Sequence, residues 1–202
     1  MDNRIPEQIE GGFTDTISEI NSETILEAVF HFKCIKKRFF DINSWELFAG
    51  EEQAEFALCD EEGELILRKT EVGNYVRIKI PVLHNLIGGN YDWVKIEVID
   101  TEETEDSEMV FVRVRPSQNP AKKNGIIAHF HQAKATSCFI IKREGTKITC
   151  EVHGRNEIPN TDHLTILQKL RNEVVSFGGA VFASKFQWKS FTDGIIEKSN
   201  CR

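Results

Sequence analysis

The chain has 202 residues, of which 40% are apolar and 28% charged, as in one ordinary globular domain. Its 25 basic and 32 acidic residues give a formal net charge of −7, which argues against a protein whose main partner is nucleic acid, because phosphate contacts need a basic face. The five cysteines form no C-x-x-C pair, so spacing predicts neither a zinc knuckle nor a thioredoxin-type site. Without a signal-peptide pattern or a long apolar run, we expect a cytoplasmic protein with no transmembrane segment.

The N-terminal part of the chain is expected to be loose and then helical. Residues 1–20 are acidic with a weak apolar pattern, which predicts a loosely ordered lead-in before a single domain over 21–202. A capping Asn21 or Ser22, followed by apolar residues at spacings of three and four, predicts an amphipathic helix over 23–39. The segment 40–48 is expected to add a short second helix.

From about residue 54 the apolar period changes to two. Apolar and polar residues alternate over 75–80, 93–99, 109–115 and 147–153, which predicts strands with one buried and one wetter face. The turn-forming segments between them are short, whereas parallel strands need crossovers of a dozen residues or more. We therefore expect consecutive antiparallel hairpins in a sheet of about six strands.

After Pro159 the period becomes helical again. Thr161 or Asp162 can cap a helix that runs to Phe177, and Gly178-Gly179 is expected to break it, because each glycine costs about 1 kcal/mol in a helix interior. Residues 180–197 are expected to form a further helix. A curved sheet with one apolar face needs a cover, so the predicted fold class is α+β, with an antiparallel sheet packed on a long C-terminal helix and preceded by an N-terminal helix.

Two segments carry a family resemblance. Trp45–Gly50 follows the first predicted helix, and Gly154–Asn160 lies between the last predicted strand and the final helical section. Together with the order of elements over 23–197, they resemble the START-like, helix-grip superfamily of lipid-transfer domains and polyketide cyclases. The chain departs from that pattern in having no clear first strand before residue 23, unless Gly12–Ile20 supplies it. The resemblance implies a cavity between sheet and C-terminal helix for an apolar or amphipathic small molecule, and no single reaction or cofactor.

Several side chains are candidates for such a cavity. Aromatic residues in the predicted strands and last helix can line it or form core. Polar residues at 155–157 can orient a ligand carboxylate or hydroxyl, or cap a helix and a turn. Two arginines in one strand can form an anion-binding wall, or pair with Glu97 on a solvent face. The candidate ligand-binding residues are Trp93, Arg113, Arg115, His153, Arg155, Asn156, Glu157, Phe182, Phe186 and Trp188.

Histidines offer a second kind of site. In an extended segment His129 and His131 share one face, and His153 follows on a later strand. Glu157 follows four residues later, and two or three histidines with a carboxylate form a ligand set suited to zinc or non-haem iron. The spacing also resembles that of the cupins, but Gln132-Ala133-Lys134 stands where that resemblance implies a carboxylate after the pair. The alternative is that these are partly exposed histidines without a metal. No catalytic residue is assigned.

We therefore expect a protein that binds an apolar or amphipathic small molecule, and the sequence leaves open whether it catalyses a reaction. The alternatives are a protein–protein interaction module whose cavity is filled by side chains, and a metal-dependent enzyme built on the three histidines. The sequence specifies neither the ligand nor the oligomeric state.

Overall fold

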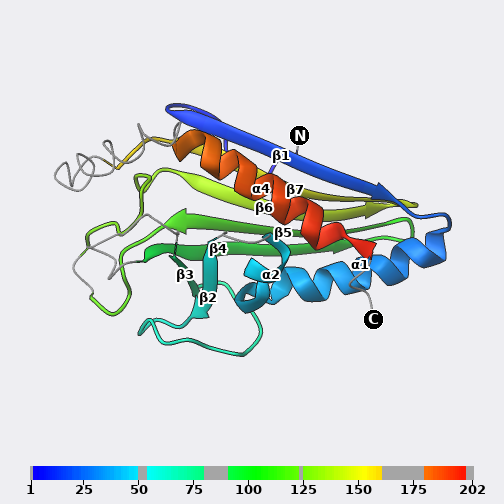
Figure 1. The fold of residues 1–202 in the computed structure, drawn as a ribbon, viewed down its shortest axis with the longest axis horizontal. Helices are drawn as coiled ribbons and strands as arrows, with labels where there is room; N and C mark the ends of the chain where they lie inside the picture. Colours follow the sequence, from blue (N-terminus) through cyan, green and yellow to red (C-terminus); the bar gives the residue numbers. More distant parts are fainter. Residues whose placement is uncertain (1, 50–53, 80–90, 123–124, 161–179, 199–202) are drawn as a thin grey trace.

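The computed structural model describes residues 2–49, 54–79, 91–122, 125–160 and 180–198 (Figure 1). The expected helix over 161–177, its break at Gly178-Gly179 and the end of the short second helix at Gly50 lie outside these residues. In chain order the elements are β1 (Gly12–Asn21), α1 (Ile25–Phe40), the 3-10 helix η1 (Ile42–Ser44), α2 (Glu46–Ala49), β2 (Glu55–Cys59), β3 (Tyr75–Lys79), β4 (Asp92–Glu103), β5 (Ser107–Pro116), β6 (Thr136–Glu144), β7 (Lys147–Glu157) and α4 (Ala180–Ile196).

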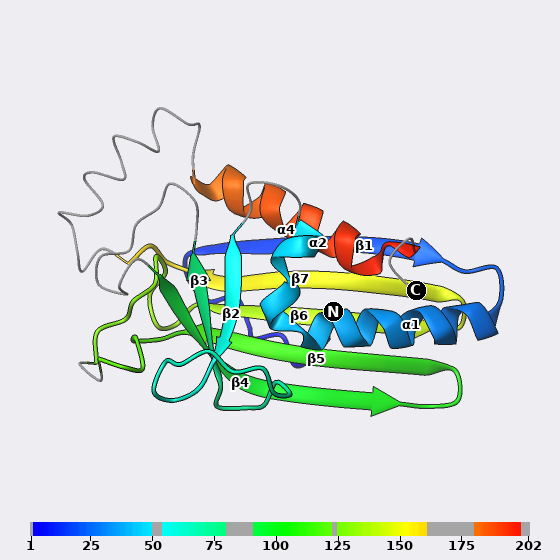
Figure 2. The same ribbon diagram turned by 60° about the horizontal axis from the view of Figure 1, so that its bottom comes forward.

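The strands form one seven-stranded sheet in the order β1-β7-β6-β5-β4-β3-β2. Every pairing in it is antiparallel, so the expected hairpins are confirmed. The helices α1, α2 and α4 lie over one face of the sheet, which we call the inner face (Figure 2). The predicted α+β class, with a sheet packed on a C-terminal helix, is therefore confirmed. None of the described helices is long and apolar enough to cross a bilayer.

The expectation of a loose lead-in was wrong for residues 12–20. They form β1, which pairs with β7 through contacts such as Ile17 with Glu151. The inner face of β1 carries the small hydroxyl side chains of Thr14, Thr16 and Ser18, all buried. An apolar pattern therefore could not reveal the strand. The Ser18 hydroxyl lies 2.7 Å from that of Thr192 on α4, which anchors the helix to this edge.

The main core lies between the inner face and the helices. Helix α1 begins at Ile25 and is capped by Thr24 rather than by Asn21 or Ser22, because the Thr24 side chain accepts the backbone N–H of Glu27. Its C-terminal half reaches α4, where Nη1 of Arg38 donates to the carbonyl oxygens of Ile195 and Glu197 at 2.9 and 2.8 Å. A guanidinium at the negative end of α4 stabilises that helix terminus.

The opposite, outer face is also covered. Residues 2–11, which we call the N-terminal strap, run over this face: Ile5 packs against a second apolar cluster that includes Phe111 and Cys138. Arg4 donates to the carboxylates of Asp100 and Glu102, each at 2.9 Å. The middle of the sheet therefore buries side chains on both faces.

Candidate functional site

Aromatic side chains gather on the inner face beneath α4. The ring of Trp45 lies 5.1 Å from Phe139 on β6 and 4.9 Å from Phe191 on α4, measured between centroids. One turn earlier on α4, the partly buried Trp188 lies 5.3 Å from Phe139 and 6.5 Å from Phe56 on β2. Edge-to-face and tilted contacts at these distances stabilise an aromatic cluster beyond simple burial. These rings join the sheet, the residue between η1 and α2, and α4 into one apolar layer.

Beyond Trp188 the inner face becomes polar. Ser137, two residues before Phe139, is partly buried and pairs across the sheet with Gly154, which in turn pairs with Thr14. The carboxylate of Glu157 accepts the Thr14 hydroxyl at 2.9 Å. It also lies directly over Gly154, because a Cβ there would fall 2.0 Å from Oε1 of Glu157. A glycine is therefore needed at position 154 for this carboxylate to lie on the inner face.

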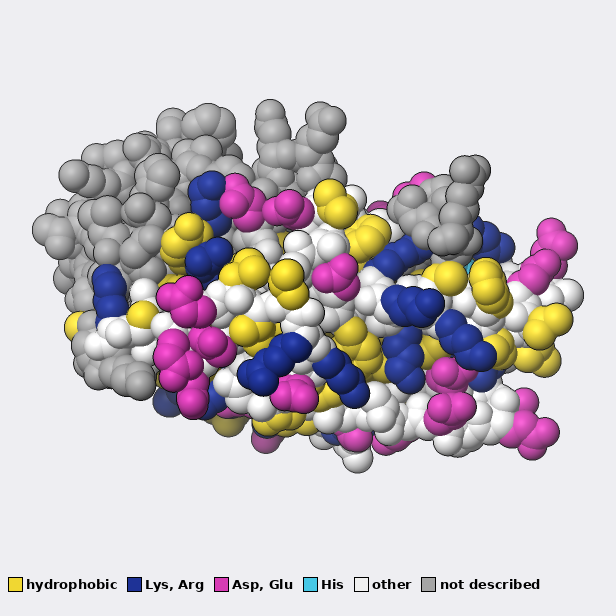
Figure 3. All heavy atoms as spheres, turned by 90° about the horizontal axis from the view of Figure 1, so that it is seen from below, with side chains coloured by type: hydrophobic (Ala, Val, Ile, Leu, Met, Phe, Trp, Pro, Cys, Tyr) yellow, Lys and Arg dark blue, Asp and Glu magenta, His cyan; other side chains and the backbone are white. Residues whose placement is uncertain are grey.

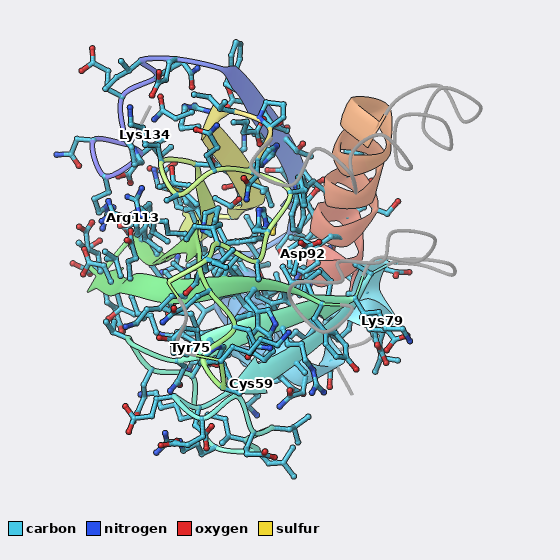
Figure 4. All side chains as sticks on the ribbon, turned by 90° about the vertical axis from the view of Figure 1, so that its left-hand side faces the viewer. Cys59, Tyr75, Lys79, Asp92, Arg113 and Lys134 are labelled. Carbon is cyan, nitrogen blue, oxygen red and sulfur yellow. The ribbon has the colours of Figure 1, made fainter. Side chains whose placement is uncertain are left out.

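We define the inner site as Phe56, Phe139 and Trp188 together with Thr14, Ser137 and Glu157. The buried Asp92 lies on the same side of the sheet, at the start of β4. Figure 4 shows Asp92 on the side of the sheet that faces α4, and Arg113 on the side away from it. An aromatic floor bordered by a hydroxyl and a carboxylate can hold a ligand that has an apolar body and a hydrogen-bond donor. Sequence reasoning missed Ser137. The signal for it is that Ser137, Phe139 and Ile141 are alternate residues of one strand and therefore face the same side of the sheet.

The predicted arginines lie on the outer face and cannot line the space beneath α4. Nε of Arg113 donates to Oε2 of Glu97 at 3.1 Å, and Nε of Arg115 donates to Oε1 of the same carboxylate at 2.6 Å. Arg115 also donates to the carbonyl oxygens of Ala133 and Lys134. The two arginines therefore share one carboxylate, and Arg115 also holds a loop. The expected cross-strand pairing of Arg113 with Glu97 is confirmed.

Trp93 also lies on the outer face, since it alternates with the inner residues Asp92 and Val94. It is 3% exposed and packs in a small cluster with Cys59 and Ala128. Its role is core packing on the side of the sheet away from α4.

His153 and Arg155 form a closed ionic cluster on the outer face. Nδ1 of His153 lies 2.5 Å from Asp15 on β1, Nε2 lies 2.9 Å from Glu151, and Nη2 of Arg155 lies 2.7 Å from Asp15. Burial lowers the pKa of His153, but the hydrogen bonds and charges of Glu151 and Asp15 outweigh it and raise the pKa above its ordinary value. Every ring nitrogen and both carboxylates have partners within the cluster, which stabilises the β1–β7 edge.

Asn156 holds the N-terminal strap. Its backbone is left-handed, with φ of 55°, a conformation that asparagine tolerates better than most residues. Its Oδ1 accepts the N–H groups of Ile9 and Glu10, and its Nδ2 donates to the carbonyl of Glu7. Of the ten predicted residues, Glu157 and Trp188 lie in the inner site, and the side chains of Phe182 and Phe186 lie outside what the structure describes.

The three histidines do not make a metal centre. The rings of His129 and His131 each lie 4.3 Å from the Phe130 ring and 5.7 Å from one another, measured between centroids. Nδ1 of His129 accepts the backbone N–H of His131 at 2.9 Å. Desolvation lowers the pKa of both imidazoles well below the ordinary value. Both nitrogens of His153 are occupied by carboxylates. Among the described residues, no group of His, Cys, Asp or Glu is arranged to hold a metal ion.

Comparisons with known proteins show distant likenesses. No family model matches the chain, and no curated protein matches it. A hypothetical protein from Helicobacter pylori is 7% identical, with a TM-score of 0.46 and coverage of 95% of this chain and 88% of that one. A major latex-like protein from Panax ginseng is 16% identical, with a TM-score of 0.33 and coverage of 83% and 98%. Norcoclaurine synthase from Thalictrum flavum is 7% identical, with a TM-score of 0.33 and coverage of 87% and 98%. Likenesses of this size establish neither a family nor a function.

Proposed function

We propose that this protein binds a small apolar or amphipathic molecule at the inner site, between the sheet and α4. The observation that carries the proposal is the partly buried Trp188, which packs on Phe139 and Phe56 where the inner face changes from aromatic to polar. The neighbouring hydroxyl of Ser137 and carboxylate of Glu157 supply the polar contacts. An apolar body would stack on the rings, and a donor group would reach the carboxylate.

The test uses the full chain and Nile red, a neutral dye whose emission rises in apolar surroundings. Ser137→Leu places a larger side chain in the inner site, and we expect it to weaken dye binding at least about tenfold. Thr149→Leu is the matched control, because Thr149 is also a half-buried hydroxyl residue but lies on the outer face. Equal binding by the wild type and Ser137→Leu would overturn the proposal, as would absence of dye binding.

Native mass spectrometry of untagged protein, before and after denaturation, tests the same proposal without a probe. We expect a discrete small mass to be released on denaturation. A clean apo mass together with no dye binding would favour a second function, that of an interaction module with a filled interior. The mutual contacts of Trp45, Phe139 and Phe191 support that alternative, since they already fill the layer beneath the second half of α4.

A further inference from the structure

The solvent side of α1 combines exposed apolar and basic side chains. Leu26 is 80% exposed and Phe30 is 63% exposed, and the next two positions on the same helical line, Lys33 and Lys37, are also exposed. Residues spaced by three and four lie along one side of a helix. We call these four residues the α1 stripe. Figure 3 shows yellow hydrophobic and dark-blue basic side chains beside one another over this helix.

Charge is segregated along the helix. Glu27 lies in the first turn, where its carboxylate accepts the backbone N–H of Glu23. The lysines occupy the second half, and neither Lys33 nor Lys37 forms an ion pair within the part of the chain that the structure describes. Lysine near a helix C-terminus complements the helix dipole. That explanation accounts for Lys37 but not for two large apolar side chains left in solvent beside it.

We propose that the α1 stripe is a peripheral binding site for an anionic lipid surface. Leucine and phenylalanine inserted at the level of the headgroups, with lysines beside them, form the pattern of an interfacial amphipathic helix. The lysines would contact lipid phosphates, although the whole chain carries a net charge of −7.

A lipid surface fits the stripe better than a protein groove does. A helix that docks in a groove presents apolar anchors at successive positions such as i, i+4 and i+7. In the α1 stripe the apolar anchors stop after Phe30, and lysines take the next two positions. Two protruding apolar side chains bordered by cations can insert into a deformable anionic lipid layer. Such a layer requires neither a continuous apolar interface nor a shaped pocket on the protein.

The test is flotation of the full chain with vesicles of phosphatidylcholine containing about one third phosphatidylserine, compared with phosphatidylcholine alone, at about 0.1 M salt. We expect binding to the anionic vesicles only. Lys33→Glu with Lys37→Glu, and separately Leu26→Ser with Phe30→Ser, are each expected to lower partitioning at least about tenfold. All four positions are exposed, so these variants are expected to fold.

Two control pairs lie on the outer face, away from α1. Lys95→Glu with Lys134→Glu matches the charge change, and Ile9→Ser with Phe13→Ser matches the apolar change, because Ile9 is 79% and Phe13 is 58% exposed. Both control pairs are expected to bind as the wild type does. The proposal is overturned if the wild type does not float with anionic vesicles, or if the Leu26→Ser/Phe30→Ser variant partitions as the wild type does. It is also overturned if either control variant loses as much vesicle partitioning as the α1 variants do. Ser137→Leu is expected to retain vesicle binding, which separates this proposal from that of the inner site.

Discussion

Nδ1 of His153 lies 2.5 Å from Oδ1 of Asp15, so an imidazole on β7 joins a carboxylate on the edge strand β1. The other ring nitrogen, Nε2, lies 2.9 Å from Oε2 of Glu151. The carboxylates of Asp15 and Glu151 are both only partly exposed. Two carboxylates beside the imidazole raise the pKa of His153 against the effect of burial, which makes the attachment of β1 dependent on pH.

We predict that this cluster contributes most stability under mildly acidic conditions. Because the pKa of His153 is raised, its contribution is complete below the unfolded value of 6.5 and is lost as pH rises through the higher folded pKa. The pKa values of Asp15 and Glu151 are lowered, so their contributions are lost only as pH falls below about 4. The difference in free energy of unfolding between the wild type and His153→Gln is therefore expected to be largest near pH 5–6 and to shrink toward pH 9.

The difference between the free energies of unfolding of the wild type and His153→Gln is used because other buried and half-buried histidines also make stability depend on pH. Burial lowers the pKa values of His31, His129 and His131, so these groups destabilise the fold as pH falls below 6.5, which overlaps the mildly acidic range where His153 contributes most. Subtracting the variant's urea unfolding curves from those of the wild type removes their titration. A difference that grows toward alkaline pH would contradict the assignment.

A second prediction concerns Arg143 and Glu108, which are paired on the inner face near the hairpin turns. The Arg143 side chain is 2% exposed, its Nε lies 3.3 Å from Oε1 of Glu108, and its Nη1 donates to the carbonyl oxygens of Asp106 and Gly145. Arg143→Leu leaves a buried carboxylate without its cation and is expected to cost about 3–5 kcal/mol. Adding Glu108→Leu is expected to recover at least half of that loss.

Lys142→Leu is the control for this pair, because the neighbouring Lys142 bonds to the exposed Glu144. A surface ion pair contributes only about 0–1 kcal/mol. Urea unfolding is measured for Arg143→Leu, for the double variant with Glu108→Leu, and for Lys142→Leu. The comparison separates the effect of breaking the buried pair from the general effect of removing a cation. If the double variant were as unstable as Arg143→Leu, lost packing rather than the unpaired carboxylate of Glu108 would explain the lower free energy of unfolding.

A third prediction uses Gly194, where α4 touches α2. A Cβ at this position would lie 2.0 Å from the carbonyl oxygen of Phe48 and 2.8 Å from its carbonyl carbon. Helix propensity alone favours Gly194→Ala by up to about 1 kcal/mol, but the clash with backbone is expected to reverse the sign and destabilise by about 1–3 kcal/mol. Ser190→Ala, one turn earlier and partly exposed, is expected to change stability by less than about 0.5 kcal/mol. If the Gly194→Ala variant were more stable than the wild type, α2 and α4 would have moved apart to accommodate the alanine Cβ.

The class of the fold could be predicted from the sequence because alternation is strong where apolar residues face the helices. Val110, Val112 and Val114 all point to the core, as their phase indicated. Strand β1 could not be found this way, since its inner side chains include the buried hydroxyls of Thr14, Thr16 and Ser18 where other strands carry apolar residues. The family resemblance nevertheless offered Gly12–Ile20 as a first strand, and this alternative is confirmed.

The candidate site is harder to predict than the fold, because residue type and strand phase indicate different locations for the same side chains. Arg113 and His153 alternate with core residues and therefore had to lie on the outer face, yet their chemistry suggested a ligand. Ser137 has the phase of the core, but a lone serine carries no chemical signal that distinguishes it from other small polar residues. The contact between Asn156 and the strap joins residues nearly 150 positions apart, and nothing in the local sequence indicates it.

The last prediction tests this contact between Asn156 and the strap. Asn156→Gly keeps a backbone that tolerates φ of 55° but removes the side-chain bonds to Glu7, Ile9 and Glu10. We expect the amides of residues 9 and 10 to exchange with solvent markedly faster, while those of the β1–β7 ladder exchange as in the wild type. Loss of these bonds is expected to cost about 1–3 kcal/mol. Asn156→Ala should cost more than Asn156→Gly, because alanine adds backbone strain at this φ. Unchanged exchange at residues 9 and 10 in Asn156→Gly would show that Ile5 and Arg4 hold the strap without it.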